Sequence, residues 1–443
     1  MKHVMNKVIA GVGAVAMLAS VAACGSTGAS DGGDQKNADG KTEITLWMWG
    51  TGPDKMIAEF EKANPDIKVN WVNAGTGEEQ YIALNNAFAS GKGAPDVIGA
   101  EYYALPQLAL SGELLDLTEM GAADLKDDYT PGTWSSVNIN GGIYGLPLDS
   151  GPMAFFYNKE IFDKAGVTEA PTTWDEYYEA AKKIHALGDN YYITSDAGDA
   201  GFFDSMVWQA GGHPFETSED GKTVSIDLTG DEGTQKFVEY WQKMIDEGLI
   251  NTKTKGWTDE WNKGLGDGTI ASLITGAWMP MNLESGAPQA SGKWRVANTP
   301  TWEEGGTENS ENGGSAYAVV SNTKKKEAAY KFVKWCSNGD GAHYNWAEIG
   351  NFPSTNKILE SDEFLSKTSD YFGGQKINEV LQKAADTVVS GYQNLPFEVQ
   401  ARKTYSDSAG KAFTGQGTLT DGVAEWQSSL IEYAKQQGFE VKE

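Results

Sequence analysis

Apolar and polar residues alternate with two different periods in the first part of the chain. Residues 44–49 alternate as in a half-buried strand, and 54–63 repeat apolar positions at helical spacing. A second strand pattern follows at 67–71, a helical one at 78–89, and a short strand pattern at 95–98. Strand, helix, strand, helix, strand is typical of a parallel α/β sheet, so the fold class is predicted to be α/β.

Residues that follow these strands are candidates for ligand contact. In parallel α/β sheets, ligands bind beyond the carboxyl ends of the strands. Trp49 follows the first predicted strand, and Glu101 and Tyr102 follow the third. We therefore expect these three side chains to face a ligand.

Residues 144–159 form an extended stretch with Pro147 and Pro152, which exclude a helix interior. The only acid in its first half is Asp149. The pattern favours a segment that crosses from one domain to another, with Asp149 facing the gap between them. An ordinary buried strand preceded by a turn explains the spacing equally well.

The middle of the chain alternates helices and strands. Thr173 to Glu176 forms a capping box before an amphipathic helix, and 235–247 is again helical. Phe202 and Asp204 begin another element. The strand 270–275 runs into Trp278, a large aromatic after two small residues, and such a position suits the wall of a cleft.

A polar loop ends at Gly313 and Gly314 before a strand at 316–321, and these glycines permit the backbone change that a second crossing needs. The rest is mostly helical. The sequence contains no internal repeat and no second low-complexity linker. The two domains are therefore predicted to be interleaved.

The N-terminus has the features of an export signal. Residues 1–23 combine a basic start with a short apolar run, which is too short for a transmembrane helix. The end of the run resembles the lipobox of bacterial lipoproteins. That resemblance implies cleavage before Cys24 and acylation of its thiol and amine. Residues 24–41 are predicted to be this lipidated cysteine and a flexible linker rich in Gly, Ser and Asp.

Composition limits the class of partner. The chain has 443 residues, and 40% of them are hydrophobic, which is enough for two domains that each have a hydrophobic core. Its formal charge is −27. Nucleic acid is excluded as a partner because its phosphates need a basic surface. A neutral small molecule fits best. With Cys24 acylated, Cys336 has no cysteine to pair with, and it is predicted to be a buried, inert thiol.

Patterns for catalysis, metal binding or cofactor binding are missing. The four His show no metal-ligand spacing, and no Cys pair is present for zinc. The Gly-x-Ser-x-Gly at 28–32 lies in the linker, and the stretch 286–293 is too long for a phosphate loop. We expect no metal, no cofactor and no catalytic residue.

Several local motifs, taken in chain order, resemble one family. They are Ala94–Ile98, Ser111–Leu117, Gly142–Pro147, Tyr157–Glu160, Pro171–Glu176, Gly268–Trp278 and Lys326–Trp335. Together they resemble the extracellular solute-binding proteins, family 1, of bacterial sugar importers (the maltose-binding-like group). The similarity runs from Ile44 to the C-terminal region.

The resemblance implies a type II periplasmic-binding-protein-like fold with two α/β lobes. The N-terminal lobe is expected to hold residues 42–149 and 316–370, and the C-terminal lobe residues 150–315 and 371–443. About three segments are expected to cross between them, near Ser150, Ser315 and residue 370, and the lobes are expected to close on a ligand like a hinged clamp.

The resemblance also places the family's cleft-wall Trp on Trp278, its early loop contacts near Glu101 and Tyr102, and a further aromatic on Phe202. The stretch Ala100–Tyr103 departs from the pattern of the maltose binders, which argues against maltose itself. Aromatic side chains cover the C–H faces of sugar rings, and acids accept hydrogen bonds from hydroxyls. The expected platforms are Trp49, Tyr102, Phe202 and Trp278. The expected acceptors are Glu101, Asp149 and Asp204, with Gly313 and Gly314 close to the ligand.

The leading hypothesis is a monomeric, non-enzymatic lipoprotein on the extracellular face of the cell membrane. It would capture a neutral di- or oligosaccharide between its lobes and deliver it to the permease subunits of an ABC importer. A secreted glycoside hydrolase is one alternative, and release of hydrolysis products would indicate it. A peptide-binding or adhesin lipoprotein is another, and it would show no sugar-induced change in Trp fluorescence.

Overall fold

The computed structural model describes residues 36–37, 39–50, 52–75 and 77–442. The predicted signal peptide and Cys24 lie outside these residues. The described residues, from residue 36 onward, form one compact unit.

The first sheet has five strands in the order β2-β1-β3-β14-β6. Its strands are β1 (Thr42–Trp47), β2 (Ile67–Val72), β3 (Val97–Glu101), β6 (Leu146–Pro147) and β14 (Ser315–Val319). β1 runs parallel to both β2 and β3, and β14 returns antiparallel to β3. The predicted parallel α/β arrangement of the first three strands is confirmed, with β1 and β3 each offset by about two residues from the expected bounds.

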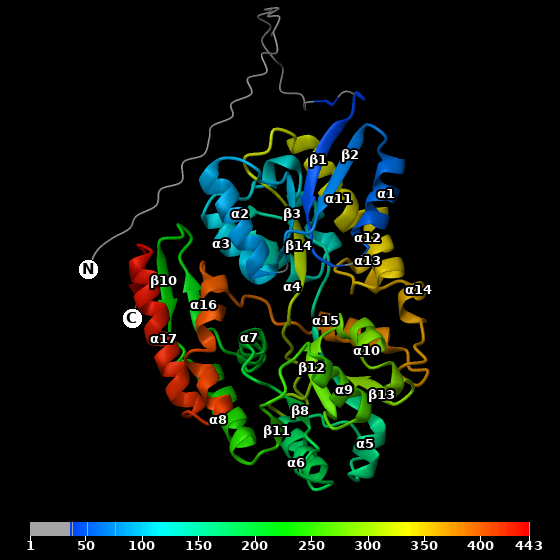
Figure 1. The fold of residues 1–443 in the computed structure, drawn as a ribbon, viewed down its shortest axis with the longest axis vertical. Helices are drawn as coiled ribbons and strands as arrows, with labels where there is room; N and C mark the ends of the chain where they lie inside the picture. The colour runs from blue at the N-terminus through cyan, green and yellow to red at the C-terminus, as the bar shows by residue number, and fades with distance from the viewer. Residues whose placement is uncertain (1–35, 38, 51, 76, 443) are drawn as a thin grey trace, which may run out of the picture. The chain divides into compact units, whose positions relative to one another are not determined.

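Helices cover this sheet (Figure 1). They are α1 (Pro53–Ala63), α2 (Glu78–Ser90), η1 (Tyr102–Ala104), α3 (Leu105–Leu110), η2 (Thr118–Met120), η3 (Ala123–Asp128), α4 (Pro131–Val137), α11 (Lys326–Asn338) and α12 (Asp340–Tyr344), beside the hairpin β4 (Asn138–Ile139) and β5 (Gly142–Ile143). α1 begins with Pro53 in its first turn, where a missing N–H costs nothing, and buries Met56, Ile57 and Phe60. Cys336 is fully buried on α11, as predicted, and burial raises the pKa of its thiol.

The second sheet is antiparallel, in the order β12-β7-β13. Its strands are β7 (Met153–Asn158), β12 (Ser272–Gly276) and β13 (Trp294–Ala297). A two-stranded sheet pairs β8 (Thr194–Ser195) with β11 (Ile250–Asn251). A three-stranded sheet has β10 (Thr223–Ile226) between β9 (Phe215–Thr217) and β15 (Glu440–Lys442). Around them lie α5 (Lys159–Lys164), α6 (Trp174–His185), α7 (Ala200–Gln209), α8 (Glu232–Asp246), α9 (Asp259–Asp267), α10 (Met279–Gly286), η4 (Pro288–Ala290), η5 (Asn345–Ile349), α13 (Asn356–Leu359), α14 (Asp362–Leu365), α15 (Ile377–Asp386), α16 (Glu398–Tyr405), η6 (Ala409–Thr414) and α17 (Leu419–Gln436).

The predicted capping box at the start of α6 is present. Thr173 accepts a hydrogen bond from the Glu176 N–H at 3.2 Å, and the Glu176 carboxylate accepts one from the Thr172 N–H at 2.7 Å. Trp174 and Tyr177 are buried, so the apolar face of this helix packs in the core, as its spacing predicts.

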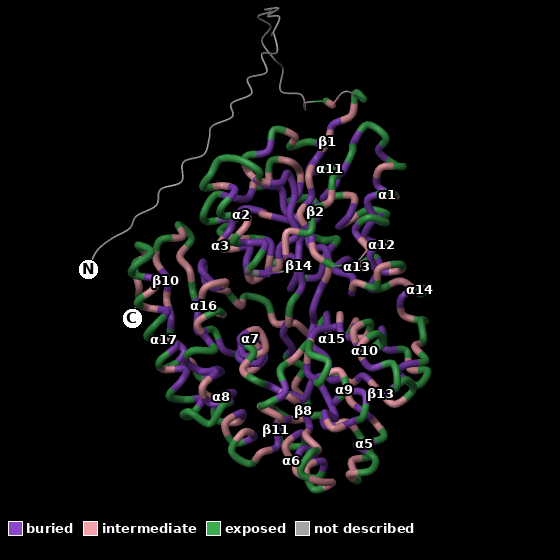
Figure 2. The backbone as a smooth tube through the Cα atoms, viewed as in Figure 1, coloured by how far each residue is buried: buried purple, intermediate pink, exposed green. Residues whose placement is uncertain are grey.

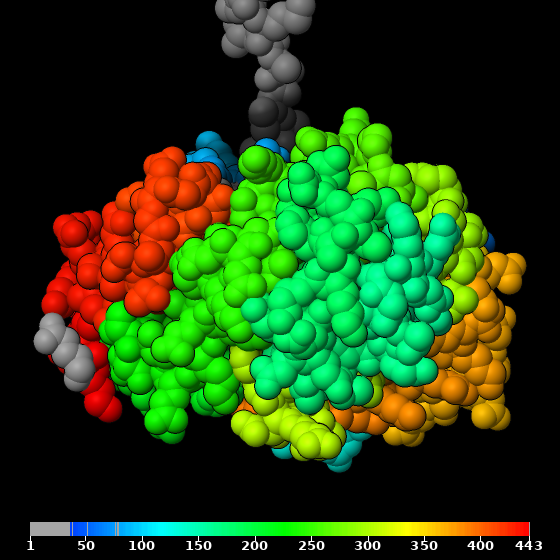
Figure 3. Space-filling view, turned by 90° about the horizontal axis from the view of Figure 1, so that it is seen from below, coloured from blue at the N-terminus to red at the C-terminus, as the bar shows by residue number. Residues whose placement is uncertain are grey.

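Buried hydrophobic residues form three separate clusters. Figure 2 shows the buried stretches of the backbone in purple around both sheets. One cluster belongs to the five-stranded sheet and its helices. Two others lie on the β12-β7-β13 side and combine residues from the middle of the chain with C-terminal ones. Figure 3 shows this mixing on the lower face, where teal and green segments lie beside orange and red ones. The predicted two-lobed α/β fold with interleaved lobes is confirmed.

Two crossing segments join the lobes as a paired ribbon. The chain passes from β6 to β7 through residues 148–152 and returns from β13 to β14 through 309–314. Backbone hydrogen bonds link the two, including Asn312 N to Gly151 O at 2.7 Å and Leu148 N to Ser315 O at 2.8 Å. The structure thus resolves the two interpretations of the 144–159 stretch: it crosses between the lobes and then becomes a buried strand.

Candidate functional site

Gly313 and Gly314 lie in the returning crossing with φ of 81° and 91°, a region that non-glycine residues rarely adopt. A Cβ on Gly313 would lie 3.0 Å from the indole nitrogen of Trp278, and one on Gly314 would lie 2.6 Å from the ring of Tyr102. The two glycines therefore let this crossing pass between Trp278 of the C-terminal lobe and Tyr102 of the N-terminal lobe. We call the two paired crossings, 148–152 and 309–314, the hinge.

Asp149 is held within the hinge. Its Oδ1 accepts hydrogen bonds from the Ser315 N–H at 2.7 Å and the Ser315 hydroxyl at 2.6 Å, so it ties the two crossings together. Burial raises its pKa to about 6 in spite of these bonds. The Tyr102 hydroxyl donates to the Asp149 carbonyl at 2.7 Å, and Tyr102 is buried. The polar groups of both residues are bonded within the protein, at the crossings, and their contact with a ligand stays a prediction.

Trp278 forms an aromatic wall in the C-terminal lobe together with a second indole. Its Nε1 donates to the Asn312 carbonyl at 2.7 Å, which fixes the ring against the hinge. Trp257 lies 5.6 Å from it, centroid to centroid, at 33°, and is 60% exposed. The two indoles border a cavity of about 120 Å³ that also contacts Phe202, Asp199 and Asn312. We call this the indole pocket.

Phe202 is half-buried on α7, where it contacts Trp241 at 5.2 Å and Phe237 at 6.2 Å. The start of α7 is fixed by Asp199, whose carboxylate accepts from the Phe202 N–H at 2.8 Å. Phe202 thus presents one edge to the indole pocket and packs its other side in the core.

Glu101 ends β3 in the N-terminal lobe. The Tyr81 hydroxyl donates to its carboxylate at 2.5 Å, and its own N–H donates to the Tyr81 oxygen at 2.9 Å. Burial raises the pKa of Glu101, although Tyr81, Arg402 and Tyr103 act in the opposite direction. Trp49 follows β1 and is half-buried against the core of the same lobe.

Arg402 connects the lobes. It lies on α16 of the C-terminal lobe, and its guanidinium carbon is 4.0 Å from the ring centroid of Tyr103 in the N-terminal lobe. On its other side, Nη2 is 2.9 Å from Asp204 Oδ2 and Nε is 3.2 Å from Glu398 Oε1. The two carboxylates are almost completely buried. Burial and the nearby Glu398 raise the pKa of Asp204, whereas Arg402 lowers it.

The structure places the predicted residues in different surroundings, and Trp49 and Glu101 border neither of the two cavities beside the hinge. Trp278, Phe202, Gly313 and Asp204 border cavities beside the hinge, and Tyr102 and Gly314 line the hinge side of one of them. Asp204 faces Arg402, and Asp149 faces Ser315.

Sequence reasoning missed Trp257, Tyr103 and Arg402. Trp257 has φ of 67° after Gly256, so a tryptophan in a Gly-containing polar loop was the available signal. Arg402 is one of only two arginines in the sequence, but nothing in the local pattern shows that two acids surround it.

The arrangement suits recognition of a polar, uncharged molecule. Indole faces offer apolar contact, and the polar residues Asp199 and Asn312 border the same pocket. Glu101 lies outside this pocket, and its carboxylate accepts a hydrogen bond from Tyr81. Among the described residues, no three His, Cys, Asp or Glu side chains are placed to hold a metal ion.

Known proteins with similar sequences and folds support this description. A solved structure of the ABC transporter associated binding protein of B. animalis subsp. lactis Bl-04, in complex with β-1,6-galactobiose, is 55% identical, with a TM-score of 0.82; the match covers 91% of this chain and 100% of that chain. The galacto-N-biose/lacto-N-biose I-binding protein of Bifidobacterium longum is 26% identical, with a TM-score of 0.77, over 91% and 99%.

The arabinooligosaccharide-binding protein of Bacillus subtilis is 27% identical over 81% of this chain and 84% of its own length. Residues 50–342, more than half of the chain, match the family described as bacterial extracellular solute-binding protein. The resemblance inferred from the sequence motifs is confirmed: the chain belongs to the family of bacterial extracellular solute-binding proteins.

Proposed function

We propose that this protein is the substrate-binding lipoprotein of an ABC-type sugar importer. It captures a neutral di- or oligosaccharide between its lobes by hinge closure and delivers it to the permease. The observation that carries the proposal is the pair of indoles at the pocket: Trp257, which is exposed, packs on Trp278, which is half-buried and bonded to the hinge through Asn312. A ligand that contacts both lobes binds the closed state more tightly than the open state, and this difference in affinity drives closure.

A β-linked galactoside is the ligand class that the relatives favour. The 55% identical protein binds β-1,6-galactobiose, and the protein from B. longum binds lacto-N-biose. The acidic chain, with a formal charge of −27, also disfavours an anionic ligand. We therefore take β-1,6-galactobiose as the first ligand to test.

In this proposal Trp278 and Trp257 stack on one ring, and Phe202 and Trp49 border it. Glu101 accepts hydrogen bonds from hydroxyls. Tyr102, Gly313 and Gly314 shape the floor of the site. Asp149 and Asp204 act through their neighbours, because their carboxylates are engaged by Ser315 and Arg402.

Calorimetry against a panel of neutral disaccharides tests this function. We expect binding of β-1,6-galactobiose with one site per chain, and recovery of the intact disaccharide by chromatography after long incubation. Hydrolysis products would favour the glycoside hydrolase alternative. Binding of peptides with no response to any sugar would favour the peptide-binding or adhesin alternative.

The membrane anchor is a separate part of the proposal. Export followed by acylation of Cys24 would hold the protein at the extracellular face of the membrane. The residues from about 25 to 41, rich in Gly and Ser, would give it reach as a linker. Replacing Cys24 with Ser is expected to release the protein into the medium and to abolish labelling by fatty acid. We also propose that the protein is a monomer, which light scattering tests.

The division of the chain between the lobes is a further proposal, with crossings near Ser150 and Ser315. The third crossing was expected near residue 370. The clusters favour an earlier position, because Phe352, Ile358 and Phe364 pack with residues of the β12-β7-β13 sheet. Limited proteolysis in the absence of ligand tests which segment is cut first.

A further inference from the structure

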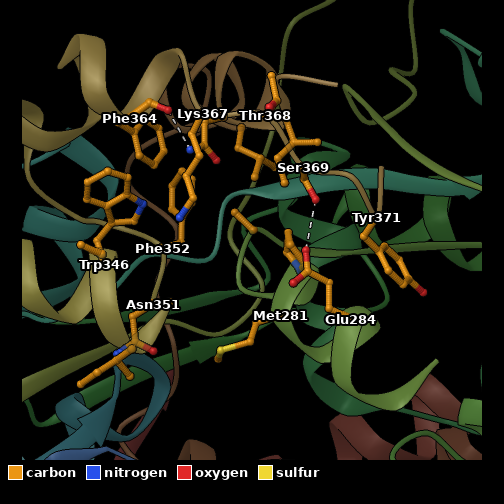
Figure 4. Close-up of a pocket in the computed structure, with 18 of the residues that line it drawn as sticks. Met281, Glu284, Trp346, Asn351, Phe352, Phe364, Lys367, Thr368, Ser369 and Tyr371 are labelled. Atoms are coloured by element: carbon orange, nitrogen blue, oxygen red, sulfur yellow. Dashed lines mark hydrogen bonds between the residues drawn. The ribbon is translucent and has the colours of Figure 1, made fainter. Parts of the chain in front are cut away.

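A second and larger cavity lies beside the indole pocket, between α10 and the segment that follows α12 (Figure 4). Its volume is about 660 Å³, within the range of small-molecule sites. Met281 and Glu284 lie on the α10 side of the cavity, and Trp346 and Asn351 lie on the other side in this view. Tyr371 lies beside Glu284, and its hydroxyl donates to the Ala287 carbonyl just after α10. We call it the α10 cavity.

The two cavities flank the same helix. Trp278, immediately before α10, and Met279 border the indole pocket. Ala277, Pro280 and Met281 border the α10 cavity. A chain of sugar units stacked on Trp278 therefore has a short path along the first turn of α10 into the larger space. Met281 is 43% exposed on this path, and its flexible thioether can adjust to a passing ring.

The lining of the α10 cavity holds polar groups that make no hydrogen bond to other described residues. These include the side chains of Asn351, Thr368 and Asp370. Glu284 is exposed and accepts a bond from Ser369 at 3.1 Å. An amide, a hydroxyl and two carboxylates beside aromatic walls complement a surface of alternating hydroxyls and C–H groups.

We propose that the α10 cavity is a subsite for the third and later units of a neutral oligosaccharide whose first ring lies on Trp278. The protein then prefers three or more sugar units over two. This proposal rests on the proposed function, because it needs the first ring to bind at the indole pocket. The indole pocket, at about 120 Å³, is much smaller than the α10 cavity. The additional room for a longer ligand is therefore in the α10 cavity.

The test compares β-1,6-linked galactobiose, galactotriose and galactotetraose by calorimetry. For the unchanged protein we expect the tri- or tetrasaccharide to bind about tenfold more tightly than the disaccharide, as one further ring contact and hydrogen bond would give. Thr368→Trp places a bulky ring in the cavity from an exposed position. It should remove the gain and leave the affinity for the disaccharide unchanged.

Thr229→Trp is the matched control, because Thr229 is exposed in a turn that borders neither cavity. This control should still bind the longer sugars more tightly than the disaccharide. Asn351→Ala removes a polar group without adding bulk, and it should reduce the difference in affinity between the longer sugars and the disaccharide. Equal affinity for all three sugars in the unchanged protein, or a full gain in Thr368→Trp, would overturn the subsite while leaving the proposed function standing. Binding of none of the three would overturn both.

Discussion

Trp257 and Trp278 share one wall of the indole pocket, the proposed sugar site, but they differ in their contacts with the rest of the protein. Trp278 is bonded to the hinge through Asn312, so its removal affects both folding and binding. Trp257 is 60% exposed and contacts Trp261 and Trp278 at its edge of the pocket. Its contribution to ligand binding can therefore be separated from its contribution to stability.

Replacing Trp257 with Ala is expected to weaken sugar binding about tenfold or more, because a stacking surface is lost. The melting temperature should change little, since the side chain is exposed. Calorimetry and thermal denaturation measure the two effects. Tyr178→Ala is the control for affinity, because Tyr178 is a half-buried aromatic on α6 that borders neither cavity, and it should leave affinity unchanged. Unaltered affinity in Trp257→Ala would remove this residue from the site.

Arg402 neutralises two buried carboxylates, so its loss should be costly. Arg402→Gln leaves Asp204 and Glu398 without their cation, and we expect a loss of about 3 kcal/mol in the free energy of unfolding at pH 7. Adding Asp204→Asn should recover part of that loss, because one of the two acids is then neutral. Urea denaturation measures both variants. Equal stability of Arg402→Gln and the unchanged protein would contradict this role.

Single residues differ in how far the sequence could predict them. The position of Trp278 beside a cavity could be predicted, because two small residues precede it and Pro280 follows at the end of a strand. The role of Asp149 could not, because its partner Ser315 is 166 positions away in the chain. Arg402 was missed for the same reason, since Tyr103 and Asp204 come from distant elements.

At the scale of elements, the paired crossings determine how the lobes can move. Their backbones approach so closely that a Cβ on Gly151 would lie 2.3 Å from the carbonyl oxygen of Asn312. Two serines and two acids then bind the segments to each other, through Asp149 with Ser315 and Ser150 with Glu311. The hinge is thus a bonded ribbon of two strands.

Gly151→Ala should force the crossings apart. We expect a loss of about 2 kcal/mol in the free energy of unfolding, as for other overpacked sites. Gly256→Ala is the control, because its added Cβ would meet no atom within 4 Å and its φ is outside the left-handed region. Chemical denaturation compares the two. An equal effect of both substitutions would show that the close approach has no importance for stability.

Glu311 makes the hinge sensitive to pH. Burial raises its pKa to about 7, with a contribution from the charge of Asp149 and an opposing one from the Ser150 hydroxyl. Its ordinary value is near 4, so between about pH 4 and pH 7 the unfolded chain releases a proton that the folded protein keeps. Stability from this group is therefore lost as the pH rises through that window.

Glu311→Gln should reduce the fall in unfolding free energy between pH 4.5 and 7.5 by on the order of 2 kcal/mol. Urea denaturation at several pH values measures this difference. Glu284→Gln, an exposed acid, serves as the control and should leave the profile unchanged. The account of the hinge fails if the two variants have the same profile as the unchanged protein.

Elements with strong periodicity could be predicted well from the sequence. The helices α1, α2 and α8 and the strands β1, β12 and β14 lie within a few residues of the predicted positions. Partners distant in the chain could not be predicted, because hydrogen bonds between crossings depend on tertiary packing. The pairing of 148–152 with 309–314 is the main example.

At the scale of the whole molecule, interleaving explains how a binding protein can close without unfolding. Each lobe has its own sheet and its own buried clusters, so the cores stay intact while the ribbon bends. Arg402 and Tyr103 touch across the gap, so their contact is expected to depend on the relative position of the lobes. Ligand binding should then reduce the radius of gyration measured by X-ray scattering.

A crystal structure of the protein with β-1,6-galactobiose tests the central claim most directly. The account predicts an intact disaccharide between the lobes, with one ring stacked on Trp278 and a hydroxyl within hydrogen-bonding distance of Glu101. A sugar bound on the outer surface of one lobe, or a cleaved one, would contradict it.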